Sequence, residues 1–175
     1  MEYRPAGAGD ARAIAALHAD SWRRHYRGSF PDAYLDGEAD ADRRAVWDER
    51  LASGPAGPGA ATVVAVDGGE VVGFVHTIYD DDPVWGALVD NLHVTADRKG
   101  DGIGTALMAR AAAGVLARPR PTGLYLWVLE ANVAAQRFYA ARGGVPSGDE
   151  WSDSPGGARV RDIRYAWADP SVLLD

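Results

Sequence analysis

Hydrophobic residues along the chain repeat at two spacings, one typical of helices and one typical of strands. Apolar positions three or four residues apart predict helices over residues 10–28, 31–35, 39–52, 99–117 and 132–142. Short apolar runs between turn residues predict strands over residues 1–6, 61–66, 71–79, 87–94, 124–129, 145–150 and 160–167. Helices mixed with strands, around a mostly antiparallel middle, predict an α/β fold.

Clusters of glycine, proline and aspartate mark the connections between these elements. Residues 67–70 (DGGE) predict a β-hairpin, and residues 80–83 (DDDP) predict a turn. Residues 53–59 (SGPAGPG) read as a loop between the helical first third and the strand-rich middle. Because neither side could bury a core alone, we expect a single domain over residues 1–175.

Composition removes several classes of site. The 175 residues include 18 basic and 25 acidic side chains, a formal charge of −7, and no cysteine. Disulfides, thiolate metal sites and a cysteine nucleophile are therefore excluded. Net acidity argues against a nucleic-acid partner, because such proteins usually present a basic face. It leaves amines as plausible partners.

Hydropathy predicts no membrane partner. No apolar run approaches the roughly 20 residues that a membrane-spanning helix needs. Residues 1–5 show no apolar segment of a signal peptide, so we expect a cytoplasmic protein. The histidines show no ligand spacing such as H-E-x-x-H, so we expect no metal.

A glycine-rich segment, residues 98–105 (RKGDGIGT), follows a predicted strand and opens a predicted helix. Glycines allow close approach of the backbone, and a helix start offers free N–H groups to an anion such as a pyrophosphate. The segment lacks the Gly-Lys-Ser/Thr ending of a P-loop, and its G-x-G-x-G spacing differs from the dinucleotide fingerprint. On composition alone, a glycine-rich turn without a ligand is an equally good interpretation.

Two motifs together resemble a known family. Residues 99–104 (KGDGIG) resemble the acetyltransferase signature [Arg/Gln]-x-x-Gly-x-[Gly/Ala]. Residues 124–143, a strand followed by Asn132 and then by Phe138-Tyr139 on a helix, resemble the second signature of that family. The chain is therefore similar, over nearly its whole length, to the GCN5-related N-acetyltransferases.

Three positions depart from that family pattern. Lys99 stands where the family usually has arginine or glutamine, at a position that acts mainly through its backbone. Asp101 brings a negative charge into an anion-binding loop, so its side chain must point away from the phosphates. Gly144 stands where the family often has phenylalanine.

The resemblance implies a central mixed sheet, mostly antiparallel and twisted, flanked by helices, and acetyl-CoA as the co-substrate. It implies that two neighbouring strands part beside the pantetheine arm and leave backbone groups to bond the cofactor. The residues that it implies for cofactor binding are Leu92, His93, Val94, Lys99, Gly100, Asp101, Gly102, Ile103, Gly104, Thr105, Asn132 and Tyr139.

Asn132 and Tyr139 are seven residues apart, nearly two helical turns, so both lie on one helix face. The resemblance implies that Asn132 bonds the cofactor arm and that Tyr139 reaches the sulfur. The alternatives are a helix N-cap for Asn132 and core packing for Tyr139. Because a tyrosine has a pKa near 10 and a thiol one near 8.5, a hydrogen bond to the leaving thiolate is as plausible as proton donation.

An amine acceptor must lose a proton before it attacks, and the base is the least determined residue. Asp90 and His93 lie on the strand beside the expected thioester, and their odd separation predicts that they face opposite sides. His76 and Glu130 are further candidates. For each of the four, a solvated or capping side chain is the alternative interpretation.

An acceptor pocket could combine aromatic rings with acidic side chains, which attract an ammonium group. The candidates are Trp22, Tyr26 and Trp85, together with Asp80, Asp81 and Asp82. The alternatives are helix-core packing for the first two rings and a solvated turn for the aspartates.

The resemblance implies an N-acetyltransferase that moves an acetyl group from acetyl-CoA to a primary amine of a small molecule or peptide. Transfer would be direct, in a ternary complex, because no covalent nucleophile is evident. The alternative is a non-catalytic acyl-CoA-binding module, and a nicotinamide-dependent reductase is a more distant one. The oligomeric state stays open, with a homodimer among the possibilities.

Overall fold

The computed structural model describes residues 1–52 and 58–174. Its strands form one sheet in the order β1-β2-β3-β4-β5-β7-β6. The strands are β1 (Glu2–Pro5), β2 (Ala60–Asp67), β3 (Glu70–Asp82), β4 (Gly86–Val94), β5 (Leu124–Leu129), β6 (Val145–Asp153) and β7 (Arg159–Trp167). Neighbouring strands are antiparallel except for the parallel pair β4 and β5. The predicted α/β fold with a mixed, mostly antiparallel sheet is confirmed.

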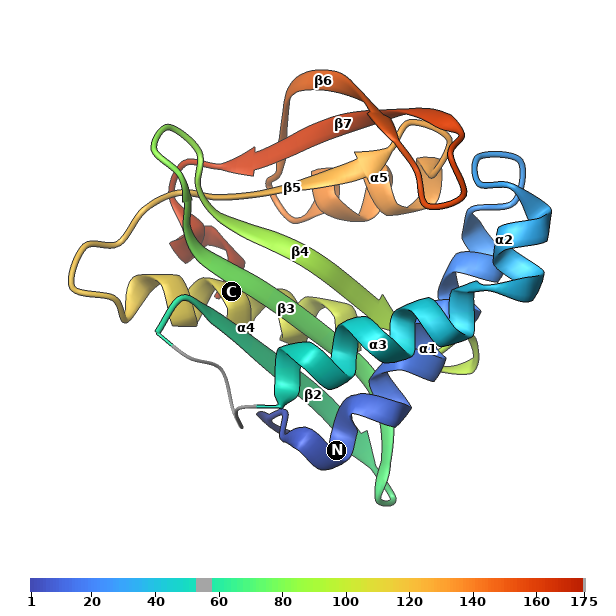
Figure 1. The fold of residues 1–175 in the computed structure, drawn as a ribbon. Coiled ribbons are helices and arrows are strands. Elements are labelled where there is room, and N and C mark those ends of the chain that lie inside the picture. Colours follow the sequence, from blue (N-terminus) through green and yellow to red (C-terminus); the bar gives the residue numbers. More distant parts are fainter. Residues whose placement is uncertain (53–57, 175) are drawn as a thin grey trace.

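Helices cover both faces of the sheet (Figure 1). They are α1 (Ala11–His25), α2 (Asp32–Gly37), α3 (Ala39–Leu51), α4 (Ile103–Leu116) and α5 (Val133–Ala141). Apolar residues of α1 and α3 pack on Val64, Val66 and Phe74 of one face. Residues of α4 and α5 pack on the other face, with β2, β3, β4 and β5. Successive side chains along a strand point to opposite faces, so the apolar residues of the strands provide packing surfaces for helices on both faces of the sheet.

Most predicted boundaries hold within three residues, and three corrections are needed. The helix predicted over residues 99–117 begins at Ile103, because Gly100 and Gly102 before it adopt left-handed φ values. The first helix ends at His25 rather than at Gly28, which lies in the following turn with a φ of 81°. The turn predicted at residues 80–83 is wrong, because β3 continues to Asp82. The Asp82 carboxylate accepts the backbone N–H groups of Val84 and Trp85, which moves the turn to residues 83–85. Most of the predicted loop at 53–59 lies outside the described residues.

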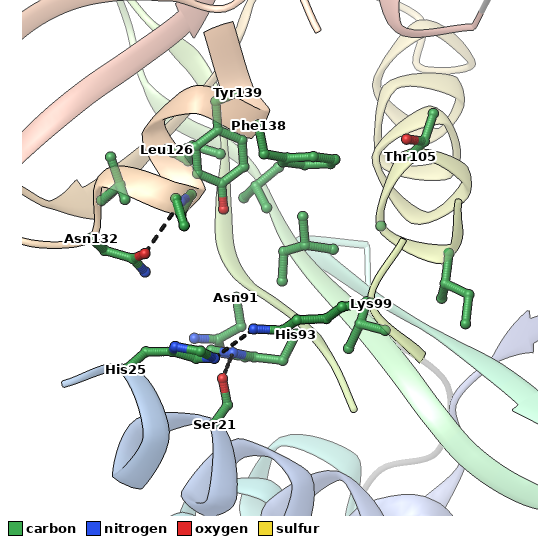
Figure 2. A pocket seen from close by; sticks show the side chains of 18 of the residues that line it. Ser21, His25, Asn91, His93, Lys99, Thr105, Leu126, Asn132, Phe138 and Tyr139 are labelled. Carbon is green, nitrogen blue, oxygen red and sulfur yellow. Dashed lines mark hydrogen bonds between the residues drawn. The ribbon is translucent and has the colours of Figure 1, made fainter. Parts of the chain in front are cut away.

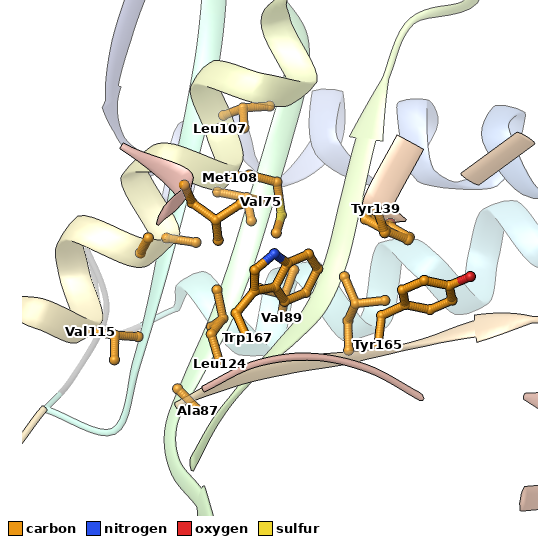
Figure 3. Packing of buried hydrophobic residues seen from close by; sticks show 14 of the residues in the cluster. Val75, Ala87, Val89, Leu107, Met108, Val115, Leu124, Tyr139, Tyr165 and Trp167 are labelled. Atoms are coloured by element: carbon orange, nitrogen blue, oxygen red, sulfur yellow. The ribbon is translucent and has the colours of Figure 1, made fainter. Parts of the chain in front are cut away.

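Trp167 fills the core between the C-terminal strand and α4 (Figure 3). Its indole N–H donates to the backbone carbonyl of Arg142 at 2.8 Å. A Cβ atom at Gly144 would lie 2.7 Å from this indole and 2.9 Å from the Tyr139 carbonyl oxygen. Residue 144 therefore has no room for a side chain, because the Trp167 ring and the Tyr139 carbonyl occupy that space.

The pairing between β4 and β5 is short. Ala87 pairs with Leu124 and Leu88 pairs with Tyr125, and beyond these two pairs the strands separate. The backbone groups that face each other across the gap need partners from elsewhere, because buried N–H and C=O groups are costly when unpaired. The gap is thus the natural place for an extended ligand.

We predict that Gly86→Ala destabilises the fold at the start of this pairing. Gly86 has a φ of +89°, and a Cβ atom there would collide with the Gly123 carbonyl oxygen. That oxygen accepts the Ala87 N–H at 3.0 Å. The free energy of unfolding, measured with urea, should fall by about 3 kcal/mol.

The matched control is Gly28→Ala. Gly28 has a φ of +81°, but nothing lies within 4 Å of the place that an added Cβ atom would take. This variant should lose only the backbone cost of about 1 kcal/mol. Equal losses in the two variants would show that the close approach at Gly86 does not matter.

Candidate active site

A cleft of about 460 Å³ opens where β4 and β5 separate (Figure 2). Its walls come from β4, β5, the start of α4, α5 and the C-terminal half of α1. Of the residues expected to bind a cofactor, these line it: Leu92, His93, Val94, Lys99, Gly100, Gly102, Ile103, Gly104, Thr105, Asn132 and Tyr139. Segments distant in sequence thus meet around one elongated space.

The start of α4 forms one end of the cleft. Gly100 and Gly102 have φ values of 96° and 78°, in the left-handed region that glycine tolerates. The first bond of the helix ladder runs from the Ala106 N–H to the Gly102 carbonyl at 3.0 Å. The amides of residues 103–105 precede that ladder, so they carry unpaired donors and the positive end of the helix dipole. This end of the cleft can therefore bind an anion.

Asp101 belongs to the same loop, but its side chain does not line the cleft. Its carboxylate is 2.8 Å from Arg98 Nε, and Arg98 also pairs with Asp67 at 2.6 Å. The charge is therefore turned away from the helix start, as its place in an anion-binding loop requires, and the loop is tied to the β2–β3 hairpin. Any contact of Asp101 with a cofactor would have to come from its backbone.

Lys99 meets His25 of α1 at the mouth of the cleft (Figure 2). The Lys99 Nζ and His25 Nε2 atoms are 2.6 Å apart. Burial and the nearby Lys99 and Arg24 lower the pKa of His25, and burial lowers the pKa of Lys99. A neutral His25 accepts a hydrogen bond from the Lys99 ammonium group, which joins α1 to the anion-binding loop.

A β-bulge in β4 changes which way its side chains point. Asn91 pairs with His76 and Val89 pairs with Thr77, so Asp90 is an extra residue between them. Asp90 pairs with Arg50 of α3 at 2.8 Å, and His93 Nδ1 lies 2.8 Å from Ser21 Oγ of α1. The prediction that Asp90 and His93 face opposite sides is wrong, since the bulge shifts the alternation by one residue.

His93 lies in an aromatic and apolar setting. Its ring centroid is 4.6 Å from that of His18 and 5.3 Å from that of Phe74. Burial, with the positive charge of Lys99 nearby, lowers the pKa of His93 to about 3. His93 is therefore neutral at neutral pH and binds a proton weakly.

Asn132, the N-cap of α5, and Tyr139 on α5 face the cleft, and each also has a structural role. Asn132 Oδ1 accepts the Ala135 N–H at 3.2 Å and so caps the helix. Tyr139 is 9% exposed, and its ring packs near Tyr165 and Trp167 with the hydroxyl directed into the cleft (Figure 2). Burial raises the pKa of Tyr139 well above its ordinary value, so the hydroxyl keeps its proton.

The expected aromatic acceptor pocket is not assembled. Tyr26 lines the cleft, and burial raises its pKa to about 12. Trp22 stacks beside Tyr26 but is buried in the core with Phe30. Trp85 lies at the β3–β4 turn, where the Arg164 guanidinium covers its ring at 4.4 Å. The three rings do not share one site because Trp85 belongs to the far end of the sheet.

The acidic segment before that turn has structural partners as well. Asp80 pairs with Arg118 at 3.0 Å, Asp81 accepts the Tyr125 hydroxyl, and Asp82 caps the turn that follows it. None of the three lines the described cleft. These aspartates therefore have structural partners near the β3–β4 connection and lie away from the described cleft.

The two remaining base candidates also lie outside the cleft wall. His76 Nδ1 is 2.7 Å from Thr62 Oγ1 between β2 and β3, and burial lowers the pKa of His76 to about 4. Glu130 forms an ion pair with Arg161 at 2.8 Å. Both side chains are committed to contacts away from the gap between β4 and β5.

Ser21, His25 and Asn91 also line the cleft, and the sequence interpretation missed them. Ser21 and His25 are four residues apart on α1, a spacing that could have identified one helix face directed at a site. The position of Asn91 depends on the bulge, and the sequence around Asp90 shows no local pattern that would predict a bulge.

In the described part of the chain, no three His, Cys, Asp or Glu side chains gather as metal ligands would. Nor does any helix there have the length and apolarity of a membrane span.

Comparisons with known proteins agree with this geometry. Residues 19–144 match the family described as "Acetyltransferase (GNAT) family". The chain is 25% identical over 175 residues to the uncharacterized N-acetyltransferase YuaI of Bacillus subtilis, covering 99% of this chain and 96% of that protein.

Solved structures share the fold. One is the PaiA N-acetyltransferase of Thermoplasma acidophilum in complex with coenzyme A, with a TM-score of 0.67, 15% identity and coverage of 94% and 98% of the two chains. Another is the ribosomal-protein-alanine N-acetyltransferase of Brucella melitensis, with a TM-score of 0.70, 19% identity and coverage of 96% and 99%.

The buried histidine beside Thr62 predicts a pH effect on stability. The folded pKa of His76, about 4, lies below the unfolded value of 6.5, so the unfolded chain binds more protons between these values. Stability from this group is complete above pH 6.5 and is lost as the pH falls toward 4. The loss should approach about 3 kcal/mol, at about 1.4 kcal/mol per unit.

His76→Gln should reduce, by about the contribution of one proton, the slope of the free energy of unfolding against pH between pH 6.5 and 4, and His93, whose folded pKa is also low, should supply part of the slope that remains. Urea unfolding followed by tryptophan fluorescence measures this slope. His25→Gln is the control, because His25 is more exposed than His76, and its removal should change the slope less than the removal of His76. An unchanged slope in the His76 variant would contradict the prediction.

Proposed function

The chain belongs to the acetyltransferase (GNAT) family, and on that premise we propose that it transfers an acetyl group from acetyl-CoA to a primary amine of a small molecule or peptide. The observation that carries the proposal is the parting of β4 and β5 in front of the α4 start. One cleft thereby joins an anion-binding helix end to a buried tyrosine hydroxyl. An extended thioester with a diphosphate at one end would place its anionic group at the helix end and its sulfur near the hydroxyl.

We assign the cofactor-binding roles along the cleft. The amides of residues 103–105 would hold the pyrophosphate, as helix starts do for anions. The β4 backbone at residues 92–94 would bond the pantetheine amides in the way that a neighbouring strand would. Asn132 keeps its side-chain N–H₂ group for the same arm, because its oxygen caps α5.

Acetyl-CoA would supply an activated acyl group: the amine nitrogen forms a bond to the carbonyl carbon, and the carbon–sulfur bond breaks. Around that step the chain offers backbone N–H groups of β4 to the developing oxyanion. The Tyr139 hydroxyl, whose pKa burial raises, would donate a hydrogen bond to the departing sulfur. Because its pKa exceeds that of a thiol, it stabilises the thiolate without fully giving up its proton.

The amine must also lose a proton, and Asp90 and His93 are our two candidates to accept it. A lysine-like ammonium has a pKa near 10.4, so direct transfer to an imidazole or to a carboxylate is uphill, and the proton must pass on to solvent. An anionic carboxylate attracts the ammonium group, whereas the buried, neutral His93 ring does not. Asp90 lines the cleft with a carboxylate, and a water between it and the amine would relay the proton. We therefore propose Asp90 as the acceptor and His93 as a neutral wall of the site.

Release of thiol from acetyl-CoA across a panel of amines tests the function. The proposal expects release that depends on both acetyl-CoA and one class of amine. Binding of acetyl-CoA without amine-dependent release by any member of the panel would instead favour the non-catalytic binding module.

We predict that Tyr139→Phe lowers kcat about 10- to 100-fold, because the leaving sulfur loses its hydrogen-bond donor. The KM for acetyl-CoA should change little, because the ring still packs against Tyr165 and Trp167. Steady-state thiol release measures both constants. A variant with wild-type turnover would remove Tyr139 from the mechanism.

For the base, we predict that Asp90→Asn lowers kcat about 10- to 100-fold, whereas His93→Asn has a smaller effect. Raising the pH should partly restore the Asp90 variant, because more of the amine is then already deprotonated. The pH–rate profile of thiol release checks this. A larger loss in the His93 variant would reverse the assignment.

A further inference from the structure

We propose that Arg50 of α3 is a positioning residue that holds the β4 bulge in the shape that the reaction requires. The inference rests on the proposed acetyl transfer. Arg50 stands behind the cleft wall rather than in it. Its Nη1 donates to Asn91 Oδ1 at 2.8 Å, and its Nη2 lies 2.8 Å from Asp90 Oδ2.

This contact pattern is possible because the strand is bulged. In a regular strand, consecutive side chains point to opposite faces of the sheet. Asp90 and Asn91 are consecutive, yet one guanidinium bonds both from the α1–α3 side. The extra residue at Asp90 brings the two side chains to the same face. Arg50 therefore stabilises the bulged arrangement over a regular one.

Arg50 is itself held in place by the core. It lies in the last turn of α3, and its guanidinium is 5.1 Å from the ring centroid of Trp47. Trp47 is fully buried and donates its indole N–H to His18 Nδ1 at 3.1 Å. The Arg50 and Asp90 side chains are 29% and 28% exposed, so the pair is shielded by the protein on one side. The bulge is thus anchored to the interior of the α1–α3 layer.

The clamp that Arg50 forms on Asp90 and Asn91 affects catalysis through β4. The bulge carries both residues into the cleft wall and sets the direction of the backbone that follows, including Leu92. A displacement of about 1 Å in such a group can cost about 100-fold in rate. Within the described residues, no hydrogen bond or ion pair joins Arg50 to the α4 start. Loss of the clamp should therefore lower kcat and spare acetyl-CoA affinity.

The test compares Arg50→Met, which keeps the aliphatic stem, with Arg50→Lys and with Arg44→Met. Arg44 is on the same helix, is exposed and pairs with Asp48 at 2.7 Å, so it matches Arg50 as an ion-pair residue without bonding β4. Arg50→Met should lower kcat about 10- to 100-fold with the KM for acetyl-CoA within about twofold. The kcat of Arg50→Lys should lie between those of the wild type and Arg50→Met, because an ammonium group cannot bond both partners as a planar guanidinium does. Arg44→Met should match the wild type.

Amide hydrogen exchange supplies a readout that does not depend on activity. Exchange in residues 88–94 should accelerate in Arg50→Met and stay unchanged in Arg44→Met, while α4 keeps its wild-type protection. Unchanged kcat and unchanged exchange in Arg50→Met would overturn the clamp and leave the proposed function standing. A uniform acceleration of amide exchange across the chain would show that Arg50 stabilises the whole fold, and this result would also overturn the clamp. A wild type that releases no thiol with any amine would overturn the proposed function, and this inference with it.

Discussion

The brief pairing of two parallel strands governs the arrangement of the rest of the site. β4 and β5 share the pairs Ala87–Leu124 and Leu88–Tyr125, and then each strand follows the helices packed on it. A sheet that parts in its middle leaves backbone donors and acceptors without a neighbour, and a buried gap of that kind is stable only if something else meets them. Water can do so in the free protein, and an extended ligand with amide groups can do so in a complex.

The two helical layers give the two sides of this gap different characters. On the α4–α5 side, a helix start and the Tyr139 hydroxyl point into the cleft, which suits an anion and a departing thiolate. On the α1–α3 side, β4 is joined to the helices by a neutral imidazole and by a pair of opposite charges. His93 contacts Ser21, and Asp90 pairs with Arg50. The groups that can stabilise negative charge thus lie on the α4–α5 side, whereas the α1–α3 layer fixes the geometry of β4.

Local chemistry in the sequence identified segments that line one cleft, whereas the errors arose where the outcome depends on contacts between distant segments. The glycines before α4 and Asn132 before α5 act within their own turns, so their residues alone reveal the helix starts. The bulge at Asp90 is instead stabilised by Arg50, about 40 residues earlier, and it reversed the expected direction of the side chains. Trp85 looked available because its partner, Arg164, is far away in sequence. The hydrophobic pattern specifies which face is buried, but it does not specify such tertiary pairs.

Calorimetric titration of the wild-type chain with acetyl-CoA tests the central claim most directly, because it asks only whether the parted strands and the α4 start bind this ligand. The account predicts a saturable heat with one site per chain, and a weaker response with dephosphorylated pantetheine derivatives that lack the diphosphate. Absence of heat with millimolar acetyl-CoA would contradict it.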